Sequence, residues 1–289
     1  MKNFGIILSV SLFILLSSGV PVEAASYSVP RTETERQQLI VKLLKEVLRL
    51  QGLLAQKLEA KSANREPYES VLFTLPIETT YFVDRGQLVP ARGGFIRPVD
   101  QEVFLLFRNV LGEAAVAKYV DEWRVFNIED SAIDAAVESV GDTGRYVVSV
   151  NRAGYSDRTL TQRSFANLFI HEYSHLLFFE RPDFVTEYTA MFWNRSDQSH
   201  AAAVARATPS RQADLLSSYF EANPDRFVTD YATVSPDEDM AETFVAFVVN
   251  EAKPAASSVK NQKIRNFYTD PAFVAVRNNL RGNLSRLGL

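Results

Sequence analysis

The sequence predicts an α+β fold, in which a small mixed sheet packs on one buried helix and a mostly helical half follows. Segments of strand composition are confined to residues 70–150, whereas from Leu160 onward apolar residues recur at helical spacing. Near the start of the helical half, the chain is apolar nearly all round, as expected of a helix inside a domain. Its apolar side chains are Phe165, Leu168, Phe169, Ile170, Tyr173, Leu176, Leu177, Phe178 and Phe179.

Residues 1–24 predict a secretory signal peptide. Lys2 supplies the charged start, residues 4–20 form the apolar run, and small residues precede Ala25, where we expect the mature chain to begin. The apolar run is near the lower length limit of a membrane span. The alternative is therefore that the segment is not cleaved and anchors the chain in a membrane. We therefore expect a secreted, periplasmic or cell-surface protein.

The composition excludes several other classes. The chain has no cysteine, so it has neither a lipoprotein attachment site nor a disulfide framework, which suits an exported bacterial protein. Its formal net charge is −4, and removal of residues 1–24 takes away one lysine and one glutamate, leaving that balance unchanged. A mildly acidic chain gives no support for nucleic-acid binding.

Residues 25–67 are expected to form a separate amphipathic helix and a linker. Within residues 33–65 the apolar side chains fall at heptad positions a and d, with charged residues on the flanks. With so few heptads, this helix is expected either to form a short coiled coil with a partner or a second copy, or equally to lie on the surface of the chain's own larger domain. The heptad positions are Ile40, Leu43, Val47, Leu50 and Leu54.

Residues 68–289 are long enough for one domain with a sizeable core. Within this domain, strands are expected over residues 70–75, 79–83, 125–128 and 146–150, with a turn at Gly93-Gly94. Helices are expected over residues 99–111, 113–123, 212–222, 238–250 and 272–284.

The buried helix carries the pentapeptide His171-Glu172-Tyr173-Ser174-His175. Positions i and i+4 are neighbours on a helix surface, so both imidazoles can reach one Zn²⁺ ion while Glu172 reaches a water bound to it. Polar groups on a buried helix need a metal or a hydrogen-bond network, because an unsatisfied one costs several kcal/mol, so an ordinary core helix with a satisfied histidine pair is the alternative. A strand over residues 145–150 precedes the helix, and an edge strand beside an active-site helix can hold an extended substrate.

A zinc site of this kind needs a third protein ligand. Phe178 and Arg181 occupy the positions where a third-histidine motif would place its glycine and histidine, and His200 lies far outside that spacing. The third ligand is therefore expected to be a carboxylate. Residues 231–244 read as a loop tyrosine, Tyr231, followed by a second helix on which two glutamates four residues apart share one face.

With these two motifs, HEYSH and Y-x6-E-D-M-A-E-T-F, the chain resembles the gluzincin metallopeptidases of the anthrax lethal factor type and bacterial zinc-binding metallopeptidases with an E-x-x-A-E segment. The resemblance covers roughly residues 145–250. It implies a zincin-like domain in which His171, His175 and Glu238 bind zinc. It also implies that Glu172 is the general base, that Glu242 orients a ligand, and that Tyr231 donates to the oxyanion.

Each residue of the second motif has an alternative reading. Ser235-Pro236 is a good helix start, so Glu238 could instead complete a capping box, which would leave Glu242 as the ligand. Glu187 is a further rival, in a similar apolar setting soon after the buried helix. Tyr231 could be a packed aromatic, and His200 is expected to be a solvated residue near a helix start rather than a substrate contact.

The sequence thus predicts a secreted zinc metalloendopeptidase that hydrolyses peptide bonds in a peptide or protein substrate, with water activated by Zn²⁺ and a glutamate base. The alternative is a catalytically silent zinc-binding module that acts as a cell-surface interaction protein through residues 33–65. A base and an oxyanion donor favour the enzyme, because a binding module needs neither.

Overall fold

The computed structural model describes residues 37, 39–47, 49–50, 53, 66–68, 75–91, 94–129, 133–156 and 161–289. The predicted signal peptide and nearly all of the predicted strand 70–75 lie outside these residues. The chain divides into two units, residues 1–56 and 57–289, each treated by itself. Within the described ranges, no helix combines the length and the hydrophobicity that a membrane crossing requires.

The N-terminal unit contains the amphipathic helix that the heptad pattern predicts. All its described residues between 37 and 53 are helical, and Arg49 pairs with Glu46 one turn earlier at 2.5 Å. The helix leaves large apolar side chains in contact with solvent, with exposed fractions between 40 and 57%. These side chains are Ile40, Val41, Leu44 and Leu53.

The second unit contains a five-stranded mixed sheet, so the α+β class is as predicted. The strand order is β2-β1-β3-β5-β4, in which β3 and β5 are parallel and the other neighbours are antiparallel. The strands are β1 (Thr79–Asp84), β2 (Gln87–Pro90), β3 (Val120–Phe126), β4 (Ala135–Ser139) and β5 (Tyr146–Asn151). Every residue of β5 is buried, which explains its mostly apolar sequence, in which only Ser149 and Asn151 are polar.

Helices α3 (Pro98–Leu111) and α6 (Gln162–Phe179) pack against the sheet through an aromatic cluster. The ring of Trp123 on β3 lies 4.9 Å from Phe107 of α3 and 6.3 Å from Phe169 of α6, and those two rings are 5.2 Å apart. All three side chains are buried, with exposed fractions of at most 1%. This core fixes α6 relative to the sheet.

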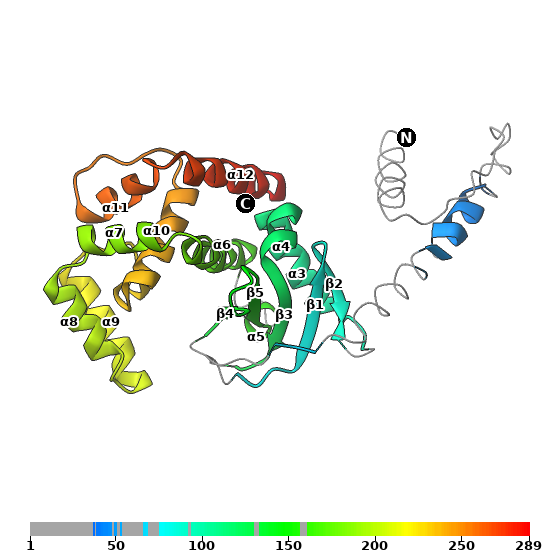
Figure 1. Ribbon diagram of the computed structural model, residues 1–289, viewed down its shortest axis with the longest axis horizontal. Coiled ribbons are helices and arrows are strands. Elements are labelled where there is room, and N and C mark those ends of the chain that lie inside the picture. Colours follow the sequence, from blue (N-terminus) through cyan, green and yellow to red (C-terminus); the bar gives the residue numbers. More distant parts are fainter. Residues whose placement is uncertain are drawn as a thin grey trace. The chain divides into compact units, whose positions relative to one another are not determined.

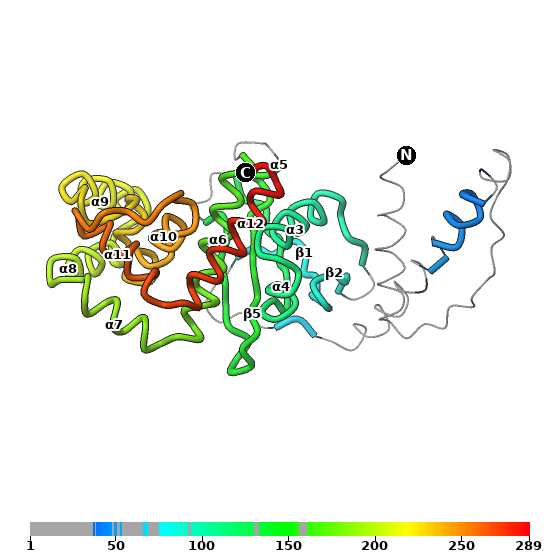
Figure 2. The backbone as a smooth tube through the Cα atoms, turned by 90° about the horizontal axis from the view of Figure 1, so that it is seen from above, coloured from blue at the N-terminus to red at the C-terminus, as the bar shows by residue number. Residues whose placement is uncertain are grey.

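The helical half follows α6, as the sequence predicts. Figures 1 and 2 both place α7–α11 on one side of α6, and β1, β2, α3 and α4 on the other. The remaining elements are α4 (Glu113–Tyr119), α5 (Ala153–Ser156), α7 (Pro182–Phe192), α8 (Arg195–Val204), α9 (Pro209–Ala222), the 3₁₀ turn η2 (Tyr231–Thr233), α10 (Pro236–Val249), α11 (Val259–Phe267) and α12 (Pro271–Leu287).

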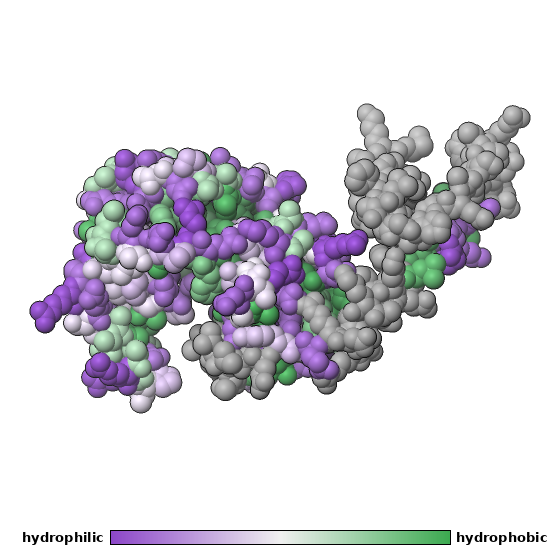
Figure 3. Space-filling model, viewed as in Figure 1, coloured by the Kyte–Doolittle hydropathy of each residue, from purple (hydrophilic) through white to green (hydrophobic). Residues whose placement is uncertain are grey.

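A second aromatic cluster joins the helical half to α6. Phe244 of α10 lies 5.9 Å from Phe178 of α6 and 5.4 Å from Phe267 of α11, ring centre to ring centre. Phe273 of α12 completes the cluster, 6.1 Å from Phe178. The cluster holds α10 across α6, which brings together the two helices that carry the candidate motifs. Outside this core, hydrophilic residues predominate on the face shown in Figure 3, with smaller apolar patches between them.

Two sequence predictions about the sheet are wrong. The helix predicted over residues 113–123 ends at Tyr119, because Val120 and Trp123 belong to β3, where pairing with β1 and β5 outweighs local helical spacing. The strand before α6 does not form the edge either. Strand β4 covers it, joined to β5 by a turn in which Gly141 and Gly144 adopt positive φ angles of 53° and 66°.

Candidate metal centre

The two histidines of the HEYSH motif lie one turn apart on α6 with their rings facing. Their Nε2 atoms are 3.2 Å apart, and the ring planes meet at 73°. Thr161 starts this helix by accepting a hydrogen bond from the backbone N–H of Ser164 at 3.1 Å. The side chains of His171 and His175 are 8 and 14% exposed, so the pair faces a recess rather than bulk solvent.

Glu238 reaches the same point from α10. Its Oε2 lies 3.0 Å from Nε2 of His171 and 3.6 Å from Nε2 of His175. The carboxylate oxygen is buried. The three side chains therefore present three ligand atoms to one point, all within 4.8 Å of one another.

These distances fit a tetrahedral zinc ion. With zinc–ligand bonds of 2.0–2.1 Å, neighbouring ligand atoms of a tetrahedron lie about 3.3 Å apart. The three separations of 3.0, 3.2 and 3.6 Å scatter around that value. Two imidazoles and one carboxylate are also the donor set of catalytic zinc sites, which keep a fourth position for water or substrate. The residues present thus fit Zn²⁺.

Glu238 lies in the first turn of α10, where Ser235 caps the helix. Its backbone N–H donates to Oγ of Ser235 at 3.2 Å, with Pro236 in the first turn, as the sequence predicts. Because the cap uses only the backbone of Glu238, its side chain is free to turn toward α6. Ser235 thus caps the helix as expected, but Glu238 does not complete the capping box, because its carboxylate lies beside His171 and His175.

Glu242, one turn further along α10, contacts the other ring nitrogen of His171. Its Oε1 lies 2.7 Å from Nδ1 of His171, and its Oε2 accepts a hydrogen bond of 2.8 Å from the Thr229 hydroxyl. A carboxylate at Nδ1 fixes the tautomer and the ring orientation that direct Nε2 toward a metal. Glu242 thus lies where a ligand-orienting residue belongs, and it lies outside the group of three.

The local charges favour the ionised forms of His171 and Glu238. Burial lowers the pKa of His171, but hydrogen bonds with Glu238 and Glu242 outweigh burial and raise that pKa to about 10. Burial favours the neutral form of Glu238, whereas hydrogen bonds with the two histidines hold its pKa at about 2. The carboxylate is therefore in the form that binds cations, whereas His171 would give up its proton on binding a metal ion.

Glu172 and Tyr231 line the recess without joining the group of three. Glu172 is 5% exposed, and burial raises the pKa of its carboxyl although the two imidazoles oppose that shift. Tyr231 is 44% exposed, and its ring centre lies 5.9 Å from that of His171. Partial burial and the charge of Glu238 raise the pKa of the phenol, which keeps its proton available for donation. Neither residue is merely packed in the core.

Two cavities open from this centre. They enclose about 460 and 660 Å³ and share Ile133, Ala135, His171, Glu172 and Tyr231. Apart from the shared residues, apolar side chains form most of the walls. The smaller cavity is lined by Leu168, Val228, Val245, Ala246 and Val249, and the larger by Ala136, Val137, Phe178, Phe179, Pro182 and Val185.

Glu187, a rival for the third ligand, and His200 both lie away from this centre. Glu187 is exposed on α7 and contributes to neither cavity. His200 was expected near a helix start in solvent, but it lies in the middle of α8 and stacks on Tyr219, with ring centres 3.9 Å apart. This contact joins two different helices, so no local sequence pattern could have predicted it.

Sequence reasoning missed two polar residues at the site. Thr229 bonds Glu242 and also accepts from the backbone N–H of Ala232 at 3.2 Å, which ties the turn containing Tyr231 to α10. Asn167 lines the smaller cavity, with its buried Oδ1 free of any hydrogen bond to a described residue. It lies four residues before His171 on α6, a spacing that places both on one helix face and could have revealed it.

Comparisons of the chain with protein-family models, with curated proteins and with solved structures gave no significant match.

Proposed function

We propose that this chain is a zinc-dependent metalloendopeptidase with a zincin-like domain of the gluzincin type. One observation carries the proposal: a glutamate from α10 meets both histidines of α6, while Glu172 and Tyr231 line the same recess. A bound zinc ion would polarise a substrate carbonyl and lower the pKa of water at the fourth position to about 7. The signal-peptide pattern of residues 1–24 supports export from the cytoplasm.

The chain's own residues supply the remaining chemistry. Glu172 would take the proton of the attacking water and hand it to the leaving amine. The Tyr231 hydroxyl would donate a hydrogen bond to the oxygen on which negative charge develops. Glu242 would keep His171 oriented throughout, since its hydrogen bond is on the ring nitrogen that faces away from Glu238.

An extended peptide would add to β4, which lies at one edge of the sheet. Ala135 lines both cavities, and β4 pairs with β5 on its other side. A substrate strand added to this edge would pass the metal centre and place side chains in cavities on either side. Because both cavities are walled mainly by apolar groups, we expect cleavage within chains, next to apolar residues.

The proposal is tested by elemental analysis coupled to digestion of an unbiased peptide library. We expect about one zinc ion per chain, and loss of that zinc in His171→Ala and in His175→Ala, because each imidazole is one of three protein ligands. The library should yield internal cleavage products with apolar residues at the cut. Zinc content near zero in protein prepared without chelators would contradict the metal site, whereas cleavage that persists in both alanine variants would contradict its role in catalysis.

A matched tyrosine pair tests the oxyanion donor. We expect Tyr231→Phe to lower turnover by about 10²- to 10³-fold, as loss of one oxyanion donor does elsewhere, with zinc content unchanged. Tyr219→Phe is the control, because its hydroxyl bonds Asp197 at 2.9 Å and it lines neither cavity. Turnover of a peptide from the library decides the matter, and a Tyr231→Phe rate within about threefold of the wild type would remove Tyr231 from the mechanism.

A second candidate function is binding without catalysis. The exposed apolar side chains of the N-terminal helix, at 40–57% exposure, are suited to contact with a partner or another copy. A silent module of this kind would hold zinc and cleave nothing. Retained zinc with no product from any library peptide would favour it.

A further inference from the structure

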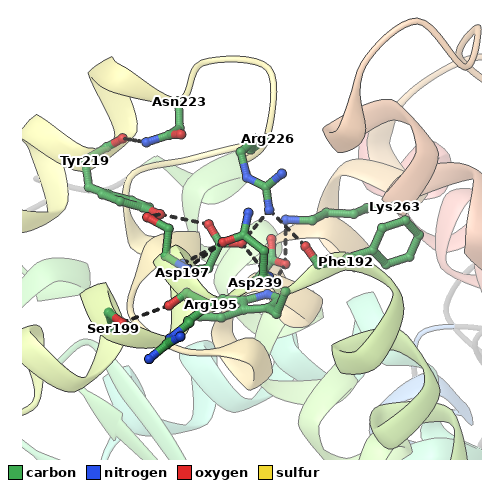
Figure 4. A network of polar contacts seen from close by, with 12 residues as sticks. Phe192, Arg195, Asp197, Ser199, Tyr219, Asn223, Arg226, Asp239 and Lys263 are labelled. Atoms are coloured by element: carbon green, nitrogen blue, oxygen red, sulfur yellow. Dashed lines mark hydrogen bonds and ion pairs between the residues drawn. The ribbon is translucent and has the colours of Figure 1, made fainter.

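Asp239, the residue after Glu238 on α10, is fully buried and surrounded by donors. Its Oδ2 accepts hydrogen bonds from Nε1 of Trp193 at 2.8 Å and from the hydroxyl of Tyr188 at 3.2 Å. The same oxygen lies 2.7 Å from Nζ of Lys263, whose side chain is also 0% exposed (Figure 4). The donors come from α7, the segment after it, and α11.

Stability alone is a weak reason to keep this ion pair. Removing two charges from water costs several kcal/mol per ion, and a well-packed apolar pair of similar volume is often equally stable or more so. Lys263 packs its ammonium over the ring of Phe227 at 4.1 Å, in surroundings that an uncharged side chain would also fill. An apolar pair would not fix the orientation of the side chain at position 239, because hydrogen bonds constrain angles and apolar contacts do not.

Direction matters here because Asp239 and Glu238 are consecutive. Successive residues of an α-helix project about 100° apart around the axis. When two hydrogen bonds and the Lys263 ammonium hold Asp239 toward α7 and α11, the first turn of α10 cannot rotate, and Glu238 is left facing His171 and His175. The three ligand separations lie between 3.0 and 3.6 Å. A rotation of α10 that moved the Glu238 oxygen by about 1 Å would take it outside this range.

We infer that Asp239 is a positioning residue for metal binding, which fixes the rotation of α10 and thereby the approach of Glu238 to the two histidines. The inference rests on the proposed function only in that Glu238 is a zinc ligand. It assigns the buried cluster of Tyr188, Trp193, Asp239 and Lys263 a role in the site, although none of the four touches the ligand atoms.

The experiment measures zinc affinity by chelator competition, and thermal stability of the zinc-free protein, on the same variants. We expect Asp239→Asn to weaken zinc binding by about 10- to 100-fold, as loss of a group that supports a ligand does. The double variant Asp239→Leu/Lys263→Met should regain the melting temperature through apolar packing but not the zinc affinity. Tyr188→Phe, which deletes one donor and keeps the ring, serves as the milder variant if Asp239→Asn does not fold.

The matched control is Asp197→Asn. Asp197 forms the neighbouring buried ion pair, with Arg226, and is 1% exposed, but it lies on α8 (Figure 4). We expect its loss to lower the melting temperature and to leave zinc affinity within about twofold. Zinc affinity that follows the melting temperature across all variants, or a folded Asp239→Asn that binds zinc like the wild type, would overturn the inference alone. A wild type that binds no zinc would overturn the proposed function as well.

Discussion

Glu172→Gln is expected to abolish peptide hydrolysis while zinc stays bound. The carboxyl is 5% exposed beside the two histidines but is not among the three ligand groups, so its amide keeps the packing and leaves the metal site intact. A neutral amide cannot accept the proton of water, and loss of a general base typically costs about 10²- to 10⁴-fold in rate. Turnover of a library-derived peptide, zinc content and the far-ultraviolet circular dichroism spectrum should be measured on one preparation.

The control for this variant is Glu187→Gln, which makes the same chemical change on the exposed face of α7. It should leave turnover and zinc content as in the wild type. If Glu172→Gln retains activity within a few-fold, Glu172 is not the base and another group must take the proton. If it also loses its zinc, the residue supports the metal rather than the chemistry.

The sequence predicts the part of the site that depends on local geometry. His171 and His175 face each other because any helix brings positions i and i+4 together. The choice among Glu238, Glu242 and Glu187 depends instead on how α10 and α7 cross α6, which no local pattern contains. The phenylalanine packing between α6 and α10 places Glu238 and Glu242 on opposite ring nitrogens of His171, and leaves Glu187 in solvent.

The same limit explains which parts of the fold were missed. Strand β5 is recognisable because it is buried on both faces and is therefore rich in valine. Strand β4 reads Ala-Ala-Val-Glu-Ser, a composition with little strand preference, and it is a strand because β5 pairs with it. Trp123 fits a helical pattern in the sequence, but its neighbours across the sheet decide its conformation.

Glu238→Gln is expected to weaken zinc binding by more than about 100-fold, because groups that only support a ligand already cost 10- to 100-fold. The amide is a poor replacement for a carboxylate that lies 3.0 and 3.6 Å from the two imidazoles. The helix cap should survive, since Ser235 bonds the backbone N–H of residue 238, which glutamine retains. Loss of the cap would lower the stability of the fold by about 1 kcal/mol, but it would not specifically weaken zinc binding.

Chelator competition on three glutamine variants separates the ligand from its neighbours. Glu242→Gln should cost about 10- to 100-fold, because it disturbs the carboxylate that holds Nδ1 of His171 at 2.7 Å, and Glu187→Gln should cost nothing. The predicted order of loss is therefore Glu238, then Glu242, then Glu187. If Glu187→Gln removes the zinc while Glu238→Gln only lowers the melting temperature, α7 supplies the third ligand. The contact of Glu238 with the two histidines would then stabilise the packing of α10 on α6 and would not bind the metal.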